Sequence, residues 1–256
     1  MSFIQIGGEN IFFSHSKSDS NDSLLLIHGS GGSHRHWHES LRNLSDINVY
    51  GLDLPGHGQS GGQGRRRVED YADFIESFVS ELKLSRVTLT GHSLGGAIAQ
   101  MLALRSPKWL SCIILVGTGA RLRVAPAILE GLLNDFQNTI ALICNYAFGP
   151  SACASLIQAG REDFLKNIPE VIHGDFSACN QFDLMEKVSR ITAPTLIISG
   201  AADRLTPVKY GEYLYHHIPG AKFSVIDDAG HLMGLEKPEI FVGVISKFLF
   251  REIGAS

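Results

Sequence analysis

The chain has 256 residues, of which 44% are apolar and 19% are charged. This length and composition suffice for one large core, so we expect a single α/β unit with an insertion rather than two full domains. The formal net charge of -4 argues against a surface that follows nucleic-acid phosphates, because such surfaces need clustered Lys and Arg. We therefore expect no nucleic-acid partner.

The first residues do not resemble an export signal or a membrane anchor. No basic stretch precedes a long apolar core there, and no charge-free segment of the chain reaches membrane-spanning length. The four cysteines lack paired or metal-type spacing, which is typical of thiols in a reducing compartment; they are Cys112, Cys144, Cys153 and Cys179. We expect a cytoplasmic protein with no membrane partner, and both a monomer and a homodimer remain open.

Short apolar runs recur along the chain. Residues 3–6 and 11–14 are separated by GGEN, which predicts an opening hairpin. Later runs are continuous in Val, Ile and Leu, as expected for parallel strands covered on both faces; they are residues 23–29, 47–54, 86–91, 111–117, 193–200 and 222–227. The segments between several of them are long enough for helical crossovers. The predicted fold class is therefore α/β, with a mostly parallel central sheet and helices on both faces.

The strand pattern stops between Pro126 and Met185. Helical periodicity replaces it, most clearly in residues 127–136 and 139–148. We interpret this part as a helical cap inserted into the core. The predicted division is a core of residues 1–119 and 189–256, with a cap of residues 120–188.

A serine marks the junction of a predicted strand and a predicted helix in VTLTGHSLGGAIAQ, residues 87–100. Gly91 and Gly95 flank Ser93, and neighbours without a Cβ allow a tight turn that projects the serine hydroxyl above the sheet. The N-terminus of the following helix would place N–H groups and a positive dipole end nearby. This pattern predicts that Ser93 is a nucleophile.

A serine nucleophile needs a base, and the base needs an orienting group. His231 lies in a predicted loop after the last strand, where it can reach over the strand ends. Asp203 directly follows the buried run of residues 193–200, at the carboxyl end of a strand. We predict the order nucleophile, acid, base for Ser93, Asp203 and His231.

Two glycine- and histidine-rich features allow other interpretations. His34 and His38 have the spacing of one helical face, but only Glu39 lies near enough in sequence to complete a ligand set, so we expect no metal. The loop HGSGGS, residues 28–33, lacks the pattern of a phosphate-binding loop. We expect instead that the backbone N–H groups of Ser30 and Leu94 form an oxyanion hole.

Five stretches resemble the α/β-hydrolase fold superfamily, in the order of that family. They are HGSGGSHRHW (28–37), GLDLPGHGQS (51–60), GHSLGGAIAQ (91–100), PTLIISGAADRLTP (194–207) and DDAGHLMGLEKPEIF (227–241). The resemblance covers the chain except the insertion. It implies Ser93 as nucleophile, Asp203 as acid, His231 as base, Ser30 and Leu94 as oxyanion donors, and a helical lid after the sixth strand, with no cofactor or metal.

The resemblance also bears on the reaction. Haloalkane dehalogenases and epoxide hydrolases carry aspartate where this chain has Ser93. Serine-dependent C–C hydrolases of ring-cleavage pathways usually have tryptophan after the histidine and proline in the oxyanion loop, whereas this chain has Leu232 and no proline in residues 28–33. We expect a carboxylesterase for a small, largely apolar ester substrate. A C–C hydrolase, an enol-lactone hydrolase and a non-catalytic small-molecule receptor remain alternatives.

The insertion should determine substrate choice. We predict that Met233, Phe136, Tyr146 and Phe148 line an apolar substrate pocket; Phe164, Phe176 and Phe182 are further candidates. Aromatic residues in a helical segment are also commonly ordinary packing residues. Met233 is included because its neighbour in sequence is the predicted base.

Overall fold

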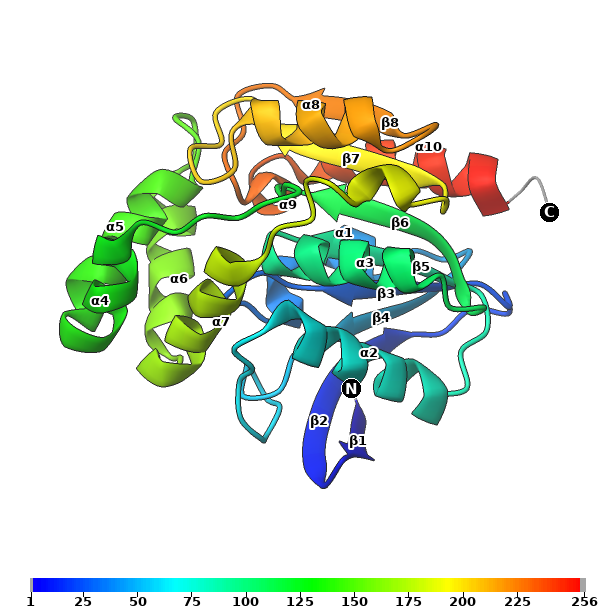
Figure 1. The fold of residues 1–256 in the computed structure, drawn as a ribbon, viewed down its shortest axis with the longest axis horizontal. Coiled ribbons are helices and arrows are strands. Elements are labelled where there is room, and N and C mark those ends of the chain that lie inside the picture. The colour runs from blue at the N-terminus through cyan, green and yellow to red at the C-terminus, as the bar shows by residue number, and fades with distance from the viewer. Residues whose placement is uncertain (1, 254–256) are drawn as a thin grey trace.

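The computed structural model describes residues 2–253 and contains an eight-stranded sheet (Figure 1). Its strands are β1 (Ser2–Ile6), β2 (Glu9–Ser16), β3 (Ser23–Ile27), β4 (Asn48–Leu52), β5 (Val87–His92), β6 (Leu110–Val116), β7 (Thr195–Gly200) and β8 (Lys222–Ile226). The spatial order is β1-β2-β4-β3-β5-β6-β7-β8. The pairs β1–β2 and β2–β4 are antiparallel, and all other pairs are parallel. The predicted opening hairpin and α/β fold class are confirmed.

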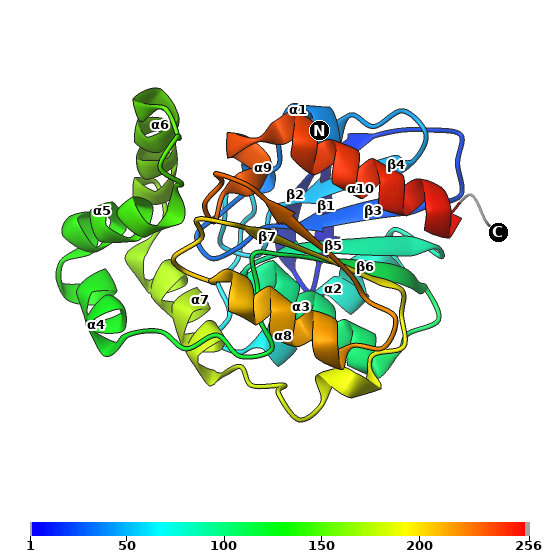
Figure 2. The same cartoon turned by 90° about the horizontal axis from the view of Figure 1, so that it is seen from above.

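Helices cover both faces of the sheet (Figures 1 and 2). One face carries α2 (Val68–Glu81), α3 (Leu94–Arg105) and α8 (Val208–His217), and the other carries α1 (Glu39–Arg42) and α10 (Pro238–Ile253). Short helical turns are η1 (His34–His36), η2 (Val188–Arg190) and α9 (Met233–Glu236). Successive side chains of a strand point to opposite faces, so Leu25 and Ile27 enter one core while Leu24 and Leu26 enter the other. This explains why β3 is apolar without alternation.

Four helices lie between β6 and β7 in sequence. They are α4 (Pro126–Asn134), α5 (Phe136–Ala147), α6 (Ala154–Leu165) and α7 (Pro169–Gln181), and we refer to residues 126–181 as the α4–α7 segment. The segment has a small apolar cluster of its own, formed by Leu132, Ile140, Ile143, Cys144, Phe164 and Ile172. Figure 2 shows the four helices together at one end of the sheet. The division into core and cap at residues 120 and 188 stays a prediction.

None of the helices described within residues 2–253 combines the length and apolar character needed to cross a membrane.

Candidate active site

Ser93 occupies a strained turn between β5 and α3. Its backbone has φ 54° and ψ -113°, a conformation that residues with a side chain rarely adopt. The two flanking positions have no room for a side chain. A Cβ on Gly91 would overlap the backbone of Gly95, and a Cβ on Gly95 would overlap the carbonyl of Ile27. The turn is therefore closely packed on its own backbone, which holds Ser93 at the end of the strand.

Hydrogen bonds fix the backbone of Ser93. Its N–H donates to the Val116 carbonyl at 2.9 Å, and the Thr118 hydroxyl donates to the Ser93 carbonyl at 2.9 Å. The side chain lines a cavity that His231 also lines, although within residues 2–253 no hydrogen bond joins the Ser93 hydroxyl to His231. Such bonds often form only when substrate is bound.

Asp203 and His231 are hydrogen-bonded side chains from two neighbouring strand ends, after β7 and β8. His231 Nδ1 lies 2.8 Å from Asp203 Oδ2. The other donors to this carboxylate are the N–H groups of Leu205 and Thr206, both at 2.8 Å, and the Thr206 hydroxyl at 2.7 Å. Burial raises the pKa of Asp203, but the charge and hydrogen bond of His231 and the Thr206 donors outweigh it, so the net pKa is lowered. An ionised Asp203 places the imidazole proton on Nδ1 and leaves Nε2 free to act as a base.

The loop that carries His231 is held on both sides. The His231 N–H donates to the carbonyl of Ala147, the last residue of α5, at 2.7 Å. The His231 carbonyl accepts a hydrogen bond from His92 Nε2 at 2.9 Å. Burial, together with the nearby His231, holds the pKa of His92 well below its usual range, so His92 is neutral and Nε2 carries its proton. His92 is not among the residues predicted from the sequence, although it directly precedes Ser93.

The two predicted oxyanion donors lie on either side of Ser93. Leu94 is the first residue of α3, where an N–H has no partner within the helix. Ser30 lies in the loop after β3, and a Cβ on the preceding Gly29 would come within 3.0 Å of the Ser93 Cβ. Within the described chain, neither the Ser30 N–H nor the Leu94 N–H donates a hydrogen bond. Both groups thus remain available to an oxyanion at Ser93.

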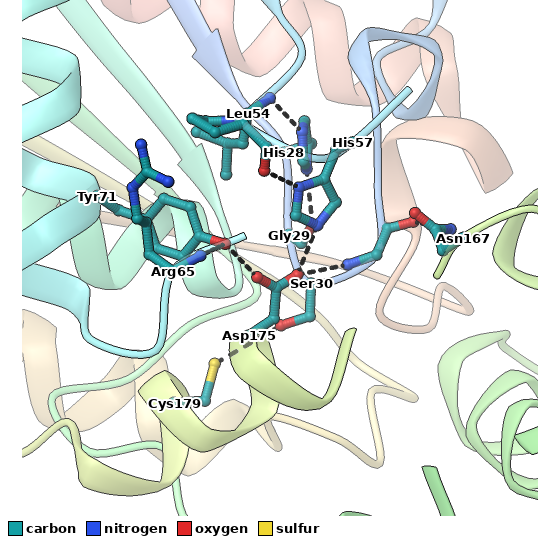
Figure 3. A network of polar contacts seen from close by, with 12 residues as sticks. His28, Gly29, Ser30, Leu54, His57, Arg65, Tyr71, Asn167, Asp175 and Cys179 are labelled. Atoms are coloured by element: carbon teal, nitrogen blue, oxygen red, sulfur yellow. Dashed lines mark hydrogen bonds and ion pairs between the residues drawn. The ribbon is translucent and has the colours of Figure 1, made fainter. Parts of the chain in front are cut away.

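A buried polar cluster lies behind the Ser30 loop (Figure 3). Its centre is Asp175 on α7, which is completely buried. The carboxylate accepts hydrogen bonds from the Gly31 N–H at 2.9 Å, from His57 Nε2 at 2.8 Å and from the Tyr71 hydroxyl at 2.5 Å. Asp175 is not among the residues predicted from the sequence, because only the fold brings α7 against this loop.

The cavity in front of Ser93 measures about 390 Å³, and its wall is mainly apolar. The lining residues outside the α4–α7 segment and its approach are Gly29, Ser30, His36, His92, Ser93, Leu122, Arg123, Val124, Arg204, Leu205, Thr206, Tyr210, His231 and Leu232. Those from the α4–α7 segment and its approach are Ala125, Ala127, Ile128, Leu142, Ile143, Tyr146, Ala147, Phe164, Phe176 and Cys179. The candidates Tyr146, Phe164 and Phe176 are among these residues, and most of the aliphatic wall was not predicted.

Four predicted pocket residues do not line this cavity: Met233, Phe148, Phe136 and Phe182. Phe182 is buried in the main apolar core. Met233 begins α9 and is completely buried in the apolar cluster that includes Phe241. Phe148 follows the end of α5 and packs with Leu232. Phe136 packs against the internal cluster of the α4–α7 segment. Apolar character alone did not distinguish packing residues from lining residues.

The histidines that raised the question of a metal have protein partners. His34 Nδ1 lies 2.8 Å from Asp53 Oδ1, and His38 accepts a hydrogen bond from the Ser40 N–H at the start of α1. Among the residues that the structure describes, no three or more His, Cys, Asp or Glu side chains are arranged to hold a metal ion.

The chain is similar to known hydrolases over most of its length. A pimeloyl-[acyl-carrier protein] methyl ester esterase of Neisseria meningitidis is 26% identical over 91% of this chain and 96% of its own. A 2-hydroxy-6-oxononadienedioate/2-hydroxy-6-oxononatrienedioate hydrolase of Cupriavidus pinatubonensis is 28% identical over 89% of this chain and 86% of its own. A solved thermophilic esterase is 37% identical with a TM-score of 0.87, covering 98% of this chain and 97% of that one. The family model for the alpha/beta hydrolase fold matches residues 22–238, and the chain belongs to this family.

Proposed function

We propose that the protein is a serine hydrolase that cleaves carboxylic esters through an acyl-enzyme. The observation that carries the proposal is the Asp203–His231 hydrogen bond of 2.8 Å, formed at the same cavity as the strained Ser93. A nucleophile, an oriented base and an ionised acid around one cavity are the groups that acyl transfer requires. The similarity to a solved esterase at 37% identity supports the same reaction class.

In the proposed mechanism, His231 Nε2 removes the proton of the Ser93 hydroxyl as its oxygen attacks the ester carbonyl carbon. Asp203 holds the imidazole in the required tautomer and stabilises its charged form. The N–H groups of Ser30 and Leu94 donate to the oxygen that becomes negative in the tetrahedral intermediate. His231 then protonates the leaving alcohol, and a water molecule activated by the same histidine hydrolyses the acyl-enzyme. Apart from the substrate and water, all the reacting groups in these steps belong to this chain.

The cavity wall supports a substrate whose acyl part is small and largely apolar. Leu142, Ile143 and Phe164 contribute to that wall from the α4–α7 segment, which we propose acts as a cap over the substrate. Hydrolysis of a C–C bond is a second candidate. It is favoured by the similarity, at 28% identity, to the 2-hydroxy-6-oxononadienedioate/2-hydroxy-6-oxononatrienedioate hydrolase of Cupriavidus pinatubonensis. The two reactions need the same nucleophile and base but different leaving groups.

The test is hydrolysis of p-nitrophenyl esters from acetate to laurate by the wild type and by Ser93→Ala, together with labelling by phenylmethylsulfonyl fluoride read by mass spectrometry. Turnover that depends on Ser93, with the label on Ser93, is expected for an esterase. Labelling of Ser93 without turnover of any ester would favour C–C hydrolysis or a receptor. Wild-type rates in Ser93→Ala would refute the assignment of the nucleophile.

A further inference from the structure

The α4–α7 segment binds both backbone polar groups of Gly31, the residue after the proposed oxyanion donor Ser30. The Gly31 N–H donates to Asp175 Oδ2 at 2.9 Å, and the Gly31 carbonyl accepts from Asn167 Nδ2 at 2.9 Å. Gly31 has φ +63°, and a Cβ there would come within 2.8 Å of Ile172 Cδ1, a side chain of α7. Only glycine combines this conformation with such close contact.

Other bonds hold the peptide between Gly29 and Ser30, which carries the Ser30 N–H. The Gly29 carbonyl accepts from His28 Nδ1 at 2.8 Å and from the Gly32 N–H at 3.0 Å. Because a trans peptide is planar, its N–H points opposite to its carbonyl, so these two bonds also orient the Ser30 N–H. The next peptide is held through the Gly31 N–H by Asp175. The Gly32 N–H lies in the same peptide as the Gly31 carbonyl that Asn167 holds, so a change in the course of the chain at Gly31 would break the Gly32 bond and release the Ser30 N–H from its present direction.

Asp175 is equipped to hold this loop firmly. It shares its buried carboxylate with His57, whose other ring nitrogen, Nδ1, lies 3.0 Å from the Pro55 carbonyl. Both ring nitrogens therefore face acceptors, and the ring carries both protons. Burial lowers the pKa of His57, but the charge and hydrogen bond of Asp175 and the Pro55 carbonyl raise it more. A charged carboxylate forms a stronger hydrogen bond with a backbone N–H than a neutral acceptor does.

One face of α7 lies against the loop. Ile172, Asp175 and Cys179 are spaced by three and four residues, which places them on the same side of a helix. Cys179 Sγ lies 3.7 Å from the Ser30 hydroxyl. Asp175 does not line the substrate cavity, whereas Ser30 does. The carboxylate therefore acts on the reaction through the loop and not by contact with substrate.

We propose that Asp175, assisted by Asn167, is a positioning residue that orients the Ser30 N–H as an oxyanion donor. The α4–α7 segment then contributes to stabilisation of the transition state as well as to the substrate pocket. This inference rests on the proposed function, since it needs an oxyanion at Ser93. It predicts that loss of the Asp175 contact lowers the rate of the chemical step and leaves ground-state binding unchanged.

The test compares Asp175→Asn with Asp135→Asn, a matched change at an exposed residue of the same segment, whose carboxylate bonds only to Asn138. For Asp175→Asn we expect kcat on a p-nitrophenyl ester to fall about 10²-fold, the loss typical of removing one oxyanion donor, with KM nearly unchanged. A trifluoromethyl ketone, which forms an oxyanion with Ser93, should bind weaker by a similar factor. The corresponding secondary alcohol, which forms none, should bind as it does to the wild type.

Asn167→Ala leaves Asp175 in place and removes the bond to the Gly31 carbonyl, together with the bonds of the same side chain to the Asp163 and Phe164 carbonyls. It serves as a second variant if Asp175→Asn does not fold. It should show the same pattern, with trifluoromethyl ketone affinity lowered about tenfold. Ketone affinity like that of Asp135→Asn, or an equal loss for ketone and alcohol, would overturn the inference. Failure of the proposed function is distinct, because either the wild type would not hydrolyse any ester or Ser93→Ala would hydrolyse it at the wild-type rate, whatever Asp175→Asn does.

Discussion

The strained backbone at Ser93 predicts that removal of its side chain stabilises the protein while abolishing activity. At φ 54° and ψ -113° the Cβ is unfavourably placed, and strain of this kind costs about 1–3 kcal/mol. Ser93→Ala loses the hydroxyl and keeps the Cβ, whereas Ser93→Gly loses both. The added freedom of glycine in the unfolded chain offsets about 0.4–1 kcal/mol of the gain. Ser93→Gly should therefore exceed Ser93→Ala in free energy of unfolding by about 1 kcal/mol.

The assay is urea unfolding of both variants, followed by circular dichroism, with Tm measured by calorimetry. For a chain of this size, about 1 kcal/mol corresponds to about 2–4 °C in Tm. Ser77→Gly and Ser77→Ala provide the control, because Ser77 is exposed on α2. There glycine should be less stable than alanine by about 1 kcal/mol. The reasoning is refuted if glycine is also the less stable of the two variants at Ser93.

Three further predictions concern the acid, the buried histidines and the pocket. Asp203→Asn should lower kcat about 10⁴-fold on a p-nitrophenyl ester, because an amide favours the wrong tautomer of the base; an effect below about tenfold would contradict the assigned role. Burial holds the pKa of His28 and of His92 well below the usual range. As pH falls, these two histidines are therefore protonated in the unfolded chain before they are protonated in the folded one. The free energy of unfolding should therefore fall below about pH 6.5, by up to about 1.4 kcal/mol per pH unit for each, and His92→Asn should remove its share of this slope in urea titrations. Val124→Phe should narrow the cavity and lower the ratio of kcat/KM for p-nitrophenyl laurate to kcat/KM for p-nitrophenyl acetate at least about tenfold. An unchanged ratio would show that Val124 does not contact the acyl chain.

The fold and the meeting of Asp203 and His231 beside the Ser93 turn could be predicted because their signals are local. Uninterrupted apolar runs identified the strands covered on both faces, and Gly91 and Gly95 identified the turn at Ser93. Asp203 and His231 each follow a strand in sequence, and the ends of neighbouring parallel strands lie together in space. These positions depend on the order of the elements and not on details of packing.

The pocket wall and the support of the oxyanion loop depend on packing, which periodicity does not specify. Met233 follows the base closely in sequence, but the start of α9 turns its side chain into the core. Phe148 lies just beyond α5, against Leu232 instead of the cavity. Asp175 has no partner within its own helix, so its three bonds appear only when α7 meets the Ser30 loop, His57 and Tyr71.

The hydrogen bond from the His231 N–H to the Ala147 carbonyl has a consequence for protein engineering. Glu236 strengthens the same junction, since its carboxylate accepts from the N–H groups of Gly149, after α5, and of Gly230, before the base. The end of α5 is thus part of the support of the histidine loop. A graft of the α4–α7 segment from a relative would transfer that relative's selectivity only if the incoming backbone supplied a carbonyl at the position of Ala147. A chimaera without it would receive a new pocket together with a misplaced base.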